Sequence, residues 1–298
     1  MRESKKKEIA QSRIVTSYKY GDTVELSTSV GKKPVMKRIS KDKMVNRITG
    51  EIKTIKHATG RADPHNYESL RQTFKRLKRL IGANFQGGKS ELWITLTYRE
   101  SPMTDSKRLY NDFGKFMRKL RRYTGKKLIY IVVIEPQASG SLHAHLLLKT
   151  PDRSKLAIPN NVVAKKWGQG FTKTKRLKDS DNISAYLMAY LTNIDLENLE
   201  GDLSKSKDES KRIIKGGRLG LYHTGMQIYR HSRTGIVEPK KYVNQKFKVQ
   251  RHWGITTSPD YYREAEFKKG KDKYKVEVEF YSFKKAKIKE AKEKNHKK

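Results

Sequence analysis

Two histidines separated by a single residue, His143 and His145, lie in the otherwise apolar stretch "GSLHAHLLLKT" at 140–150. Successive side chains of a β-strand point to opposite faces, so residues two apart share a face. One face of this stretch then carries two imidazoles, and the other is a core face made of Leu142, Ala144, Leu146 and Leu148. Two surface histidines on a sheet are the simplest interpretation of such a pair. The residues around the pair must decide whether it binds a ligand.

A carboxylate precedes the two histidines at the distance that a β-hairpin requires. Glu135 ends the apolar run "LIYIVVIEP", and the turn between Glu135 and His143 is symmetric about position 139. In such a hairpin Glu135 faces His143 directly, with Cβ atoms about 5 Å apart; Gln137 is a possible substitute ligand. Two imidazoles and a carboxylate on one face predict a site for a divalent metal cation, Mg²⁺ or Mn²⁺, with positions left for substrate oxygens. The same ligand set also suits a non-haem iron oxygenase.

Two tyrosines four residues apart, Tyr186 and Tyr190, occur in "DNISAYLMAYLTN" at 181–193. Asp181 can cap a helix here, and residues four apart on a helix lie on the same face. Phenols can act as nucleophiles in covalent catalysis. A tyrosine pair at the edge of the core, with its hydroxyls in water, is the alternative.

The composition indicates a polyanionic partner. The 298 residues include 68 Lys and Arg against 31 Asp and Glu, a formal net charge of +37. Such an excess repels itself unless a polyanion neutralises it, which favours nucleic acid over an anionic membrane. The longest apolar run is far shorter than the roughly 20 residues that cross a bilayer, and no secretory signal is visible. The absence of cysteine fits a reducing cytoplasm and excludes a thiol nucleophile.

A glycine-rich stretch, "GGKS" at 87–90, is not a phosphate-binding loop. Ala83 stands where that motif needs glycine, and the stretch follows a predicted helix and precedes a predicted strand, the reverse of the motif's order. The sequence therefore gives no indication of an ATPase.

The order of predicted elements indicates an α+β fold with a central antiparallel β-sheet flanked by helices. From 91 to 195 the pattern predicts strand, helix, strand, strand, helix, a basic loop "GQGFTKTKRLKD", and a further helix. Strands joined by a tight turn must be antiparallel. We expect a basic N-terminal extension at 1–60, a folded domain at 61–245 and a C-terminal basic region at 246–298, disordered from about 283.

Three motifs in this order resemble those of the HUH endonucleases: "LWITLTY", "EPQASGSLHAHLLL" and "YLMAYLTN". The resemblance covers about 65 to 240 and is closest to rolling-circle replication initiators of Gram-positive plasmids, phages and integrative elements. Paired tyrosines four apart resemble initiators in which both phenols act. Those initiators commonly have a lysine three residues after each tyrosine, where this chain has Ala189 and Asn193. Lys165, Lys166 or Lys173 can take that part.

The resemblance implies a fold, an activity and partners. The domain at 61–245 becomes a nuclease domain that nicks and rejoins single-stranded origin DNA, with a metal on Glu135, His143 and His145. Tyr186 or Tyr190 attacks the strand, giving a 5′-phosphotyrosine link and a free 3′-OH. The implied partners are host helicase and replication proteins in the bacterial cytoplasm, with neither membrane nor ATP. Basic residues expected to bind DNA phosphates are Lys165, Lys166, Lys173, Lys175, Arg176, Arg76, Arg79 and Arg121.

Other functions remain open at this stage. A conjugative relaxase or single-strand transposase shares the same chemistry. A non-catalytic basic nucleic-acid-binding protein predicts no dependence on metal and no covalent adduct. A metal oxygenase predicts iron binding and indifference to replacement of the tyrosines.

Overall fold

The computed structural model describes residues 7–28, 35–56, 64–137, 139–177, 222, 226–269 and 272–283, although the side chains of 64–71, 267–269 and 272–274 are not described. The chain forms two compact units. We call residues 56–237 the central unit, and residues 1–55 with 238–298 the terminal unit.

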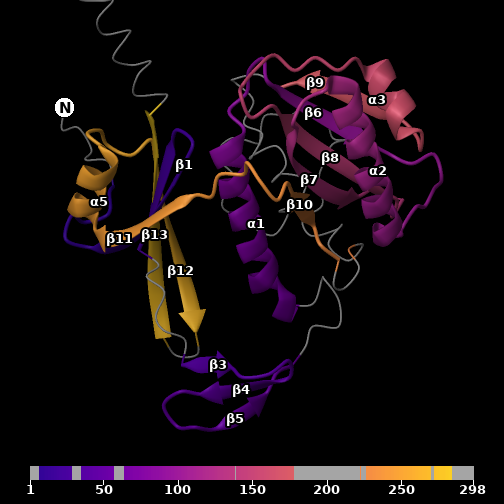
Figure 1. The fold of residues 1–298 in the computed structure, drawn as a ribbon. Coiled ribbons are helices and arrows are strands. Elements are labelled where there is room, and N and C mark those ends of the chain that lie inside the picture. The colour runs from indigo at the N-terminus through magenta and orange to yellow at the C-terminus, as the bar shows by residue number, and fades with distance from the viewer. Residues whose placement is uncertain are drawn as a thin grey trace, which may run out of the picture. The chain divides into compact units, whose positions relative to one another are not determined.

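The central unit is built on a five-stranded sheet of order β10-β7-β8-β6-β9, in which every neighbouring pair is antiparallel (Figure 1). Its strands are β6 (Glu91–Leu96), β7 (Ile129–Pro136), β8 (Leu142–Lys149), β9 (Thr172–Arg176) and β10 (Tyr229–His231). The strands β7 and β8 are buried along most of their length, as their apolar sequences predict. The α+β fold with an antiparallel sheet and flanking helices is confirmed.

Helices cover both faces of this sheet (Figure 1). Helix α2 (Ser106–Thr124) packs against one face, where Phe113 contacts Tyr130 of β7, and α3 (Asn160–Trp167) adjoins α2. Helix α1 (Pro64–Asn84) ends at the other face, where Lys149 of β8 donates to the backbone oxygen of Asn84. The stretch 87–90 connects α1 to β6, which is the helix-then-strand order expected from the sequence.

The basic segment after α3 corrects one prediction. We expected a loop there, but residues 172–176 form β9, the edge strand that pairs with β6. Thr172 and Thr174 alternate with Lys173 and Lys175, which is a strand pattern with cationic side chains on one face. Lysines are tolerated at a sheet edge because they discourage pairing with another chain. The density of lysine hid this alternation in the sequence.

The terminal unit joins the two ends of the chain in one sheet of order β11-β1-β2-β13-β12. Its strands are β1 (Ile14–Tyr20), β2 (Thr23–Ser27), β11 (Lys240–Gln245), β12 (Tyr261–Lys269) and β13 (Asp272–Ser282). Helix α5 (Lys246–Trp253) contacts β1 and β11, and Val15, Leu26 and Val249 are completely buried in the unit's own core. The sequence analysis treated the two ends as separate extensions, whereas β1 pairs with β11 and β2 with β13.

A small sheet of three short strands, β3 (Met36–Arg38), β4 (Lys43–Asn46) and β5 (Ile52–Thr54), completes the described elements of the terminal unit. Its side chains are mostly exposed, including Ile52. No helix among the described residues is both long and apolar enough to cross a membrane.

Candidate metal centre and nucleic-acid interface

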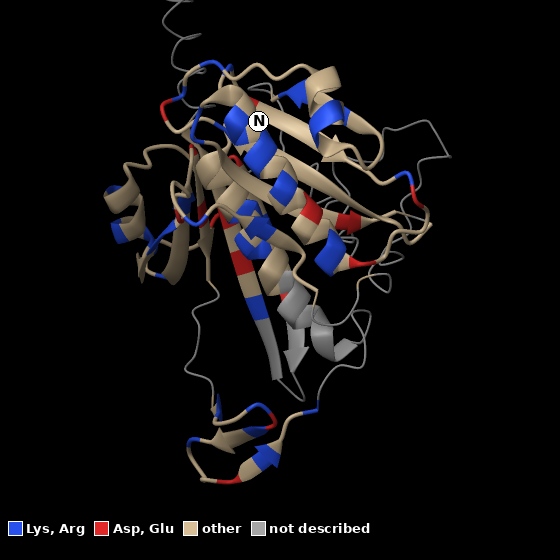
Figure 2. Ribbon diagram, turned by 45° about the vertical axis from the view of Figure 1, so that its right-hand side comes forward, with Lys and Arg blue, Asp and Glu red and all other residues tan. Residues whose placement is uncertain are grey.

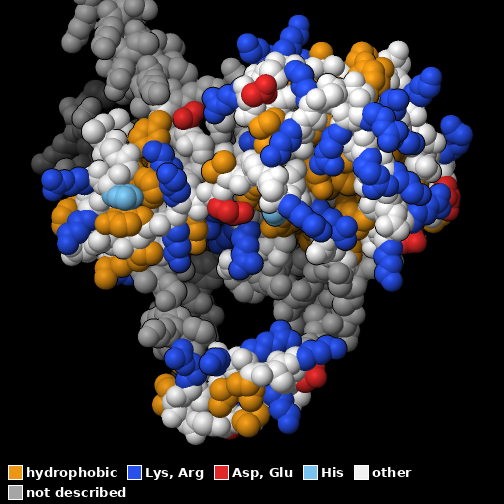
Figure 3. Space-filling model, viewed as in Figure 1, with side chains coloured by type: hydrophobic (Ala, Val, Ile, Leu, Met, Phe, Trp, Pro, Cys, Tyr) orange, Lys and Arg blue, Asp and Glu red, His pale blue; other side chains and the backbone are white. Residues whose placement is uncertain are grey.

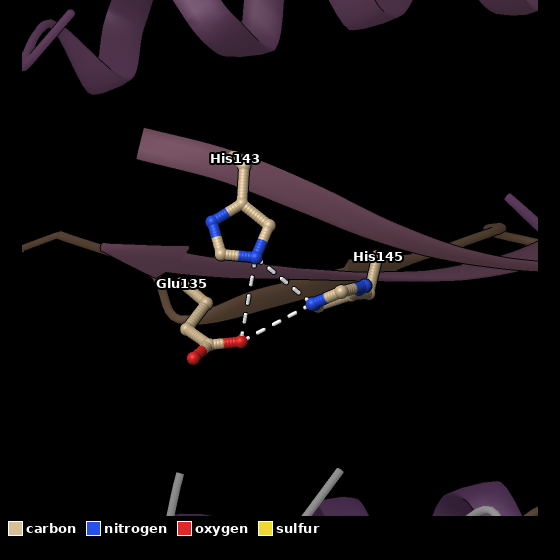
Figure 4. A group of neighbouring side chains, drawn as sticks. All are labelled: Glu135, His143 and His145. Carbon is tan, nitrogen blue, oxygen red and sulfur yellow. Dashed lines mark hydrogen bonds and ion pairs between the residues drawn. The ribbon is translucent and has the colours of Figure 1, made fainter. Parts of the chain in front are cut away.

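The hairpin of β7 and β8 brings Glu135, His143 and His145 together (Figure 4). Glu135 is the register partner of His143, as the symmetric turn predicts. His145 follows two residues later on β8 and therefore shares the face of His143. All three side chains point toward one another, and we call them the triad.

The donor atoms of the triad form a compact triangle. His143 Nε2 lies 2.9 Å from His145 Nε2, and Glu135 Oε2 lies 3.1 Å from His145 Nε2 and 3.5 Å from His143 Nε2. A cation with bonds of about 2.1 Å separates neighbouring ligand atoms by about 3.0 Å in an octahedron and about 3.4 Å in a tetrahedron. The triangle therefore has the edge lengths of three ligands on one side of a cation. The triad can hold a divalent metal ion.

The protonation states of the triad also fit a cation. Burial raises the pKa of Glu135, but hydrogen bonds with His143 and His145 outweigh it and lower the pKa to about 2. Burial lowers the pKa of His145, against the opposing hydrogen bond from Glu135. At pH 7 Glu135 is an anion and His145 is neutral, which are the forms that bind metal.

Two residues of β6 contact the far side of the His145 ring. Trp93 Nε1 and Thr95 Oγ1 each lie 3.3 Å from His145 Nδ1, and the Trp93 ring meets the His145 ring edge-on. Thr95 is the register partner of His145 across β6 and β8. The sequence analysis did not assign these two residues to the site. The alternation of "LWITLTY" could have identified them, since it places Trp93 and Thr95 on the face opposite to the leucines.

Two predicted DNA-binding lysines lie on the triad's face of the sheet. Lys173 of β9 is the register partner of Thr95, and Lys175 is the register partner of Trp93. The ammonium of Lys175 sits 4.4 Å from the centroid of the Trp93 ring, and its charge further lowers the pKa of His145. Both lysines are exposed. They can bind phosphates next to the triad.

The other predicted basic residues are not gathered at the triad. Arg121 is on α2, and Lys165 and Lys166 are on α3, on the side of the sheet that α2 covers. Arg176 donates to backbone oxygens of Gly88, Lys89 and Leu156, so it holds two loops together. Arg76 and Arg79 lie on α1. Lys and Arg side chains occur on strands and helices of both units (Figure 2) and over much of the face in Figure 3.

Two further predictions have different outcomes. Tyr186 and Tyr190 lie outside the described residues, as does the helix expected around them. Gln137 lies in the turn between β7 and β8, where its backbone N–H donates to the oxygen of Ser141.

A comparison with known families adds to this geometry. Residues 91–195 match the family model of the replication-associated protein ORF2. No curated protein and no solved structure matches the chain significantly. The family match supports a role in DNA replication, in agreement with the initiator expected from the sequence. The matched segment runs from the start of β6 through the triad and β9 to the segment with Tyr186 and Tyr190.

Proposed function

We propose that the chain is a rolling-circle replication initiator that nicks and rejoins single-stranded origin DNA through a tyrosine nucleophile and a divalent metal cation. We assign this activity to an HUH endonuclease domain within residues 61–245. The observation that carries the proposal is the content of the family match at 91–195: one continuous segment holds the triad, the lysines of β9 and both tyrosines.

The triad and the β9 lysines provide the binding part of the reaction. A divalent cation held by Glu135, His143 and His145 supplies positive charge at the phosphate oxygens of the bound strand. Lys173 and Lys175 extend that positive charge along the same face of the sheet. Phosphate contacts of this kind fix the position of the strand without reading its sequence.

The tyrosines provide the chemical step. The phenolic oxygen of Tyr186 or Tyr190 bonds to phosphorus while the bond from phosphorus to the 3′-oxygen breaks. The 3′-oxygen takes up a proton and leaves as a free 3′-OH, and the 5′-phosphate remains on the tyrosine. The phosphodiester is exchanged for another phosphodiester, so the reverse reaction rejoins the ends without ATP.

Deprotonation of the phenol needs help at neutral pH, because its unperturbed pKa is near 10. Ala189 and Asn193 stand where related initiators commonly place lysines. Lys173, on the same sheet face as the triad, or Lys165 or Lys166 takes the place of those lysines. The second tyrosine allows a new cut while the first tyrosine is still attached to DNA.

A labelled-strand assay tests this proposal. The protein is incubated with Mn²⁺ or Mg²⁺ and end-labelled single-stranded DNA from its own locus, and products are separated in SDS. We expect an SDS-stable adduct and a labelled fragment, both abolished by chelator and by the double substitution Tyr186→Phe and Tyr190→Phe. Tyr123→Phe, which changes an exposed tyrosine of α2, is the matched control and retains the adduct.

The outcomes separate the competing functions. Full adduct formation by the double variant refutes the nucleophile assignment. Binding with neither adduct nor metal dependence indicates a non-catalytic nucleic-acid-binding protein. Cleavage of a transfer origin or of terminal hairpins, in preference to a replication origin, indicates a relaxase or a transposase of the same chemistry.

A further inference from the structure

The two neighbours of His145 Nδ1 differ in their hydrogen-bonding capacity. Trp93 Nε1 and Thr95 Oγ1 are both 3.3 Å from Nδ1. An indole N–H can only donate, whereas a hydroxyl can donate or accept. Because a neutral imidazole carries one proton, these two neighbours favour different tautomers of His145.

The contact with Trp93 favours the tautomer that cannot bind metal through Nε2. If the indole N–H donates to Nδ1, this nitrogen holds a lone pair, and the ring proton sits on Nε2. That proton then points to Glu135 Oε2, at 3.1 Å. The hydrogen bond to Glu135 thus completes a stable metal-free arrangement.

The contact with Thr95 favours the opposite tautomer. Ligation through Nε2 leaves the ring proton on Nδ1, and this N–H needs an acceptor in a half-buried site. Of the two neighbours described at Nδ1, only Thr95 Oγ1 can accept. We propose that Thr95 is a positioning residue that holds His145 in its metal-binding tautomer, and that Trp93 stabilises the metal-free tautomer.

The place of Thr95 in the sheet suits this role. It lies on β6, between its register partners His145 on β8 and Lys173 on β9. Backbone pairing on both sides fixes the strand, so the hydroxyl needs only to rotate about its C–O bond to change from donor to acceptor. The two β6 side chains form a selector whose setting depends on whether a cation occupies the triad. This inference rests on the proposed metal site.

Metal affinity measured without DNA tests the inference. Mn²⁺ binding to the full chain is followed by calorimetry for Thr95→Val, which keeps the side-chain shape and removes the acceptor. We expect its Kd to rise about 10- to 100-fold, because loss of a partner of a metal-bound histidine typically has that effect. Thr95→Ser restores the acceptor and stays within about threefold of the wild type. Trp93→Phe, which removes the competing donor, lowers the Kd.

Thr97→Val is the matched control. Thr97 comes two residues after Thr95 and donates to the backbone oxygen of Phe171. We expect its Mn²⁺ affinity to be unchanged. A Kd for Thr95→Val equal to that of the wild type, or a similar rise for Thr97→Val, overturns the inference and leaves the nicking proposal in place. If His143→Ala leaves Mn²⁺ affinity unchanged, the metal site itself is wrong.

The tautomer can also be observed directly. In ¹⁵N-histidine-labelled protein, we expect the His145 proton on Nε2 without metal and on Nδ1 with bound Zn²⁺, a diamagnetic probe. Because this measurement uses the wild-type chain, it is independent of any folding defect in the variants. A His145 ring that keeps its proton on Nδ1 in both states contradicts the selector.

Discussion

At the residue scale, the triad joins side chains that would be costly to bury apart. Glu135 is only 2% exposed and has His143 and His145 as hydrogen-bonding neighbours. An isolated buried carboxylate would be strongly destabilising, but here the two rings lower its pKa to about 2. His143 contributes Nε2 to this cluster, while its buried Nδ1 has no hydrogen-bond partner among the described residues. A buried nitrogen left without a partner is uncommon in a purely structural histidine.

The substitution His143→Ala tests whether this residue serves chemistry or folding. We expect DNA cutting to be lost, by at least about 100-fold, while salt-sensitive DNA binding and the melting temperature change little. His231→Ala, an exposed histidine on β10, is the matched control and retains both activities. Equal loss of cutting and binding in His143→Ala would mean that the histidine mainly supports the fold.

At the element scale, strand β9 is the part of the candidate interface that the structure added. Its lysines lie beside the triad because β9 pairs with β6, which in turn pairs with β8. Removing both charges with Lys173→Ala and Lys175→Ala should weaken binding to all single-stranded sequences alike. The slope of log K against log salt should fall by about 1.4, because each lost phosphate contact on a single strand contributes about 0.7.

A double variant of equal charge change provides the control. Lys126→Ala with Lys127→Ala removes two cations just before β7, whereas Glu135 lies near the end of that strand. We expect a smaller loss of affinity from this pair than from the β9 pair. If the two double variants bind equally weakly, the basic surface acts as a whole and β9 has no special part in it.

Two glycines of the central unit should respond to alanine in opposite directions. A Cβ on Gly170, between α3 and β9, would lie 2.6 Å from the backbone of Tyr98 and Arg99, so Gly170→Ala must displace one segment. We expect a loss of about 1–3 kcal/mol in the free energy of unfolding. Gly114, inside α2, has only the end of Arg118 near its Cβ position, and Gly114→Ala should stabilise by about 0.5–1 kcal/mol. Urea unfolding measures both, and destabilisation by the α2 variant would contradict this packing.

Much of the central unit could be predicted from the sequence, and the reasons are local. The hairpin of β7 and β8 follows from a symmetric turn, and α2 begins at Asp105 and ends at Gly125 as its caps indicate. The strand β9 and the contacts of Trp93 and Thr95 with His145 could not be predicted as readily. They depend on which strands become neighbours in the sheet, and strand order arises from contacts between residues far apart in the sequence.

At the scale of the whole molecule, the chain has two cores with separate compositions. The core of the central unit carries the triad, and the terminal unit combines β1 and β2 with strands that begin after residue 240. The terminal unit also buries Lys246 completely, with hydrogen bonds to Glu279 and to the backbone oxygen of Ile9. Segments from both ends of the chain are therefore required to satisfy that charge.

A charge placed in the terminal core should separate the two units experimentally. Leu26 is completely buried on β2, so Leu26→Asp should disrupt the terminal unit and expose β12 and β13 to proteolysis. Mn²⁺ affinity at the triad should stay within about threefold of the wild type. Ile52→Asp, at an exposed position of β5, is the control that changes neither property. Loss of Mn²⁺ binding in Leu26→Asp alone would show that the triad depends on the terminal unit.

The site of covalent attachment tests the central claim most directly. After reaction with single-stranded origin DNA and Mn²⁺, the protein is digested with nuclease and trypsin, and peptides carrying a nucleotide are sequenced by mass spectrometry. We predict a nucleotide joined through its 5′-phosphate to the tryptic peptide 179–205, which contains both Tyr186 and Tyr190, with fragment ions that place it on one of them. Cleaved DNA with a free 5′-phosphate and no modified peptide, or a nucleotide on any residue other than these two tyrosines, would contradict the account.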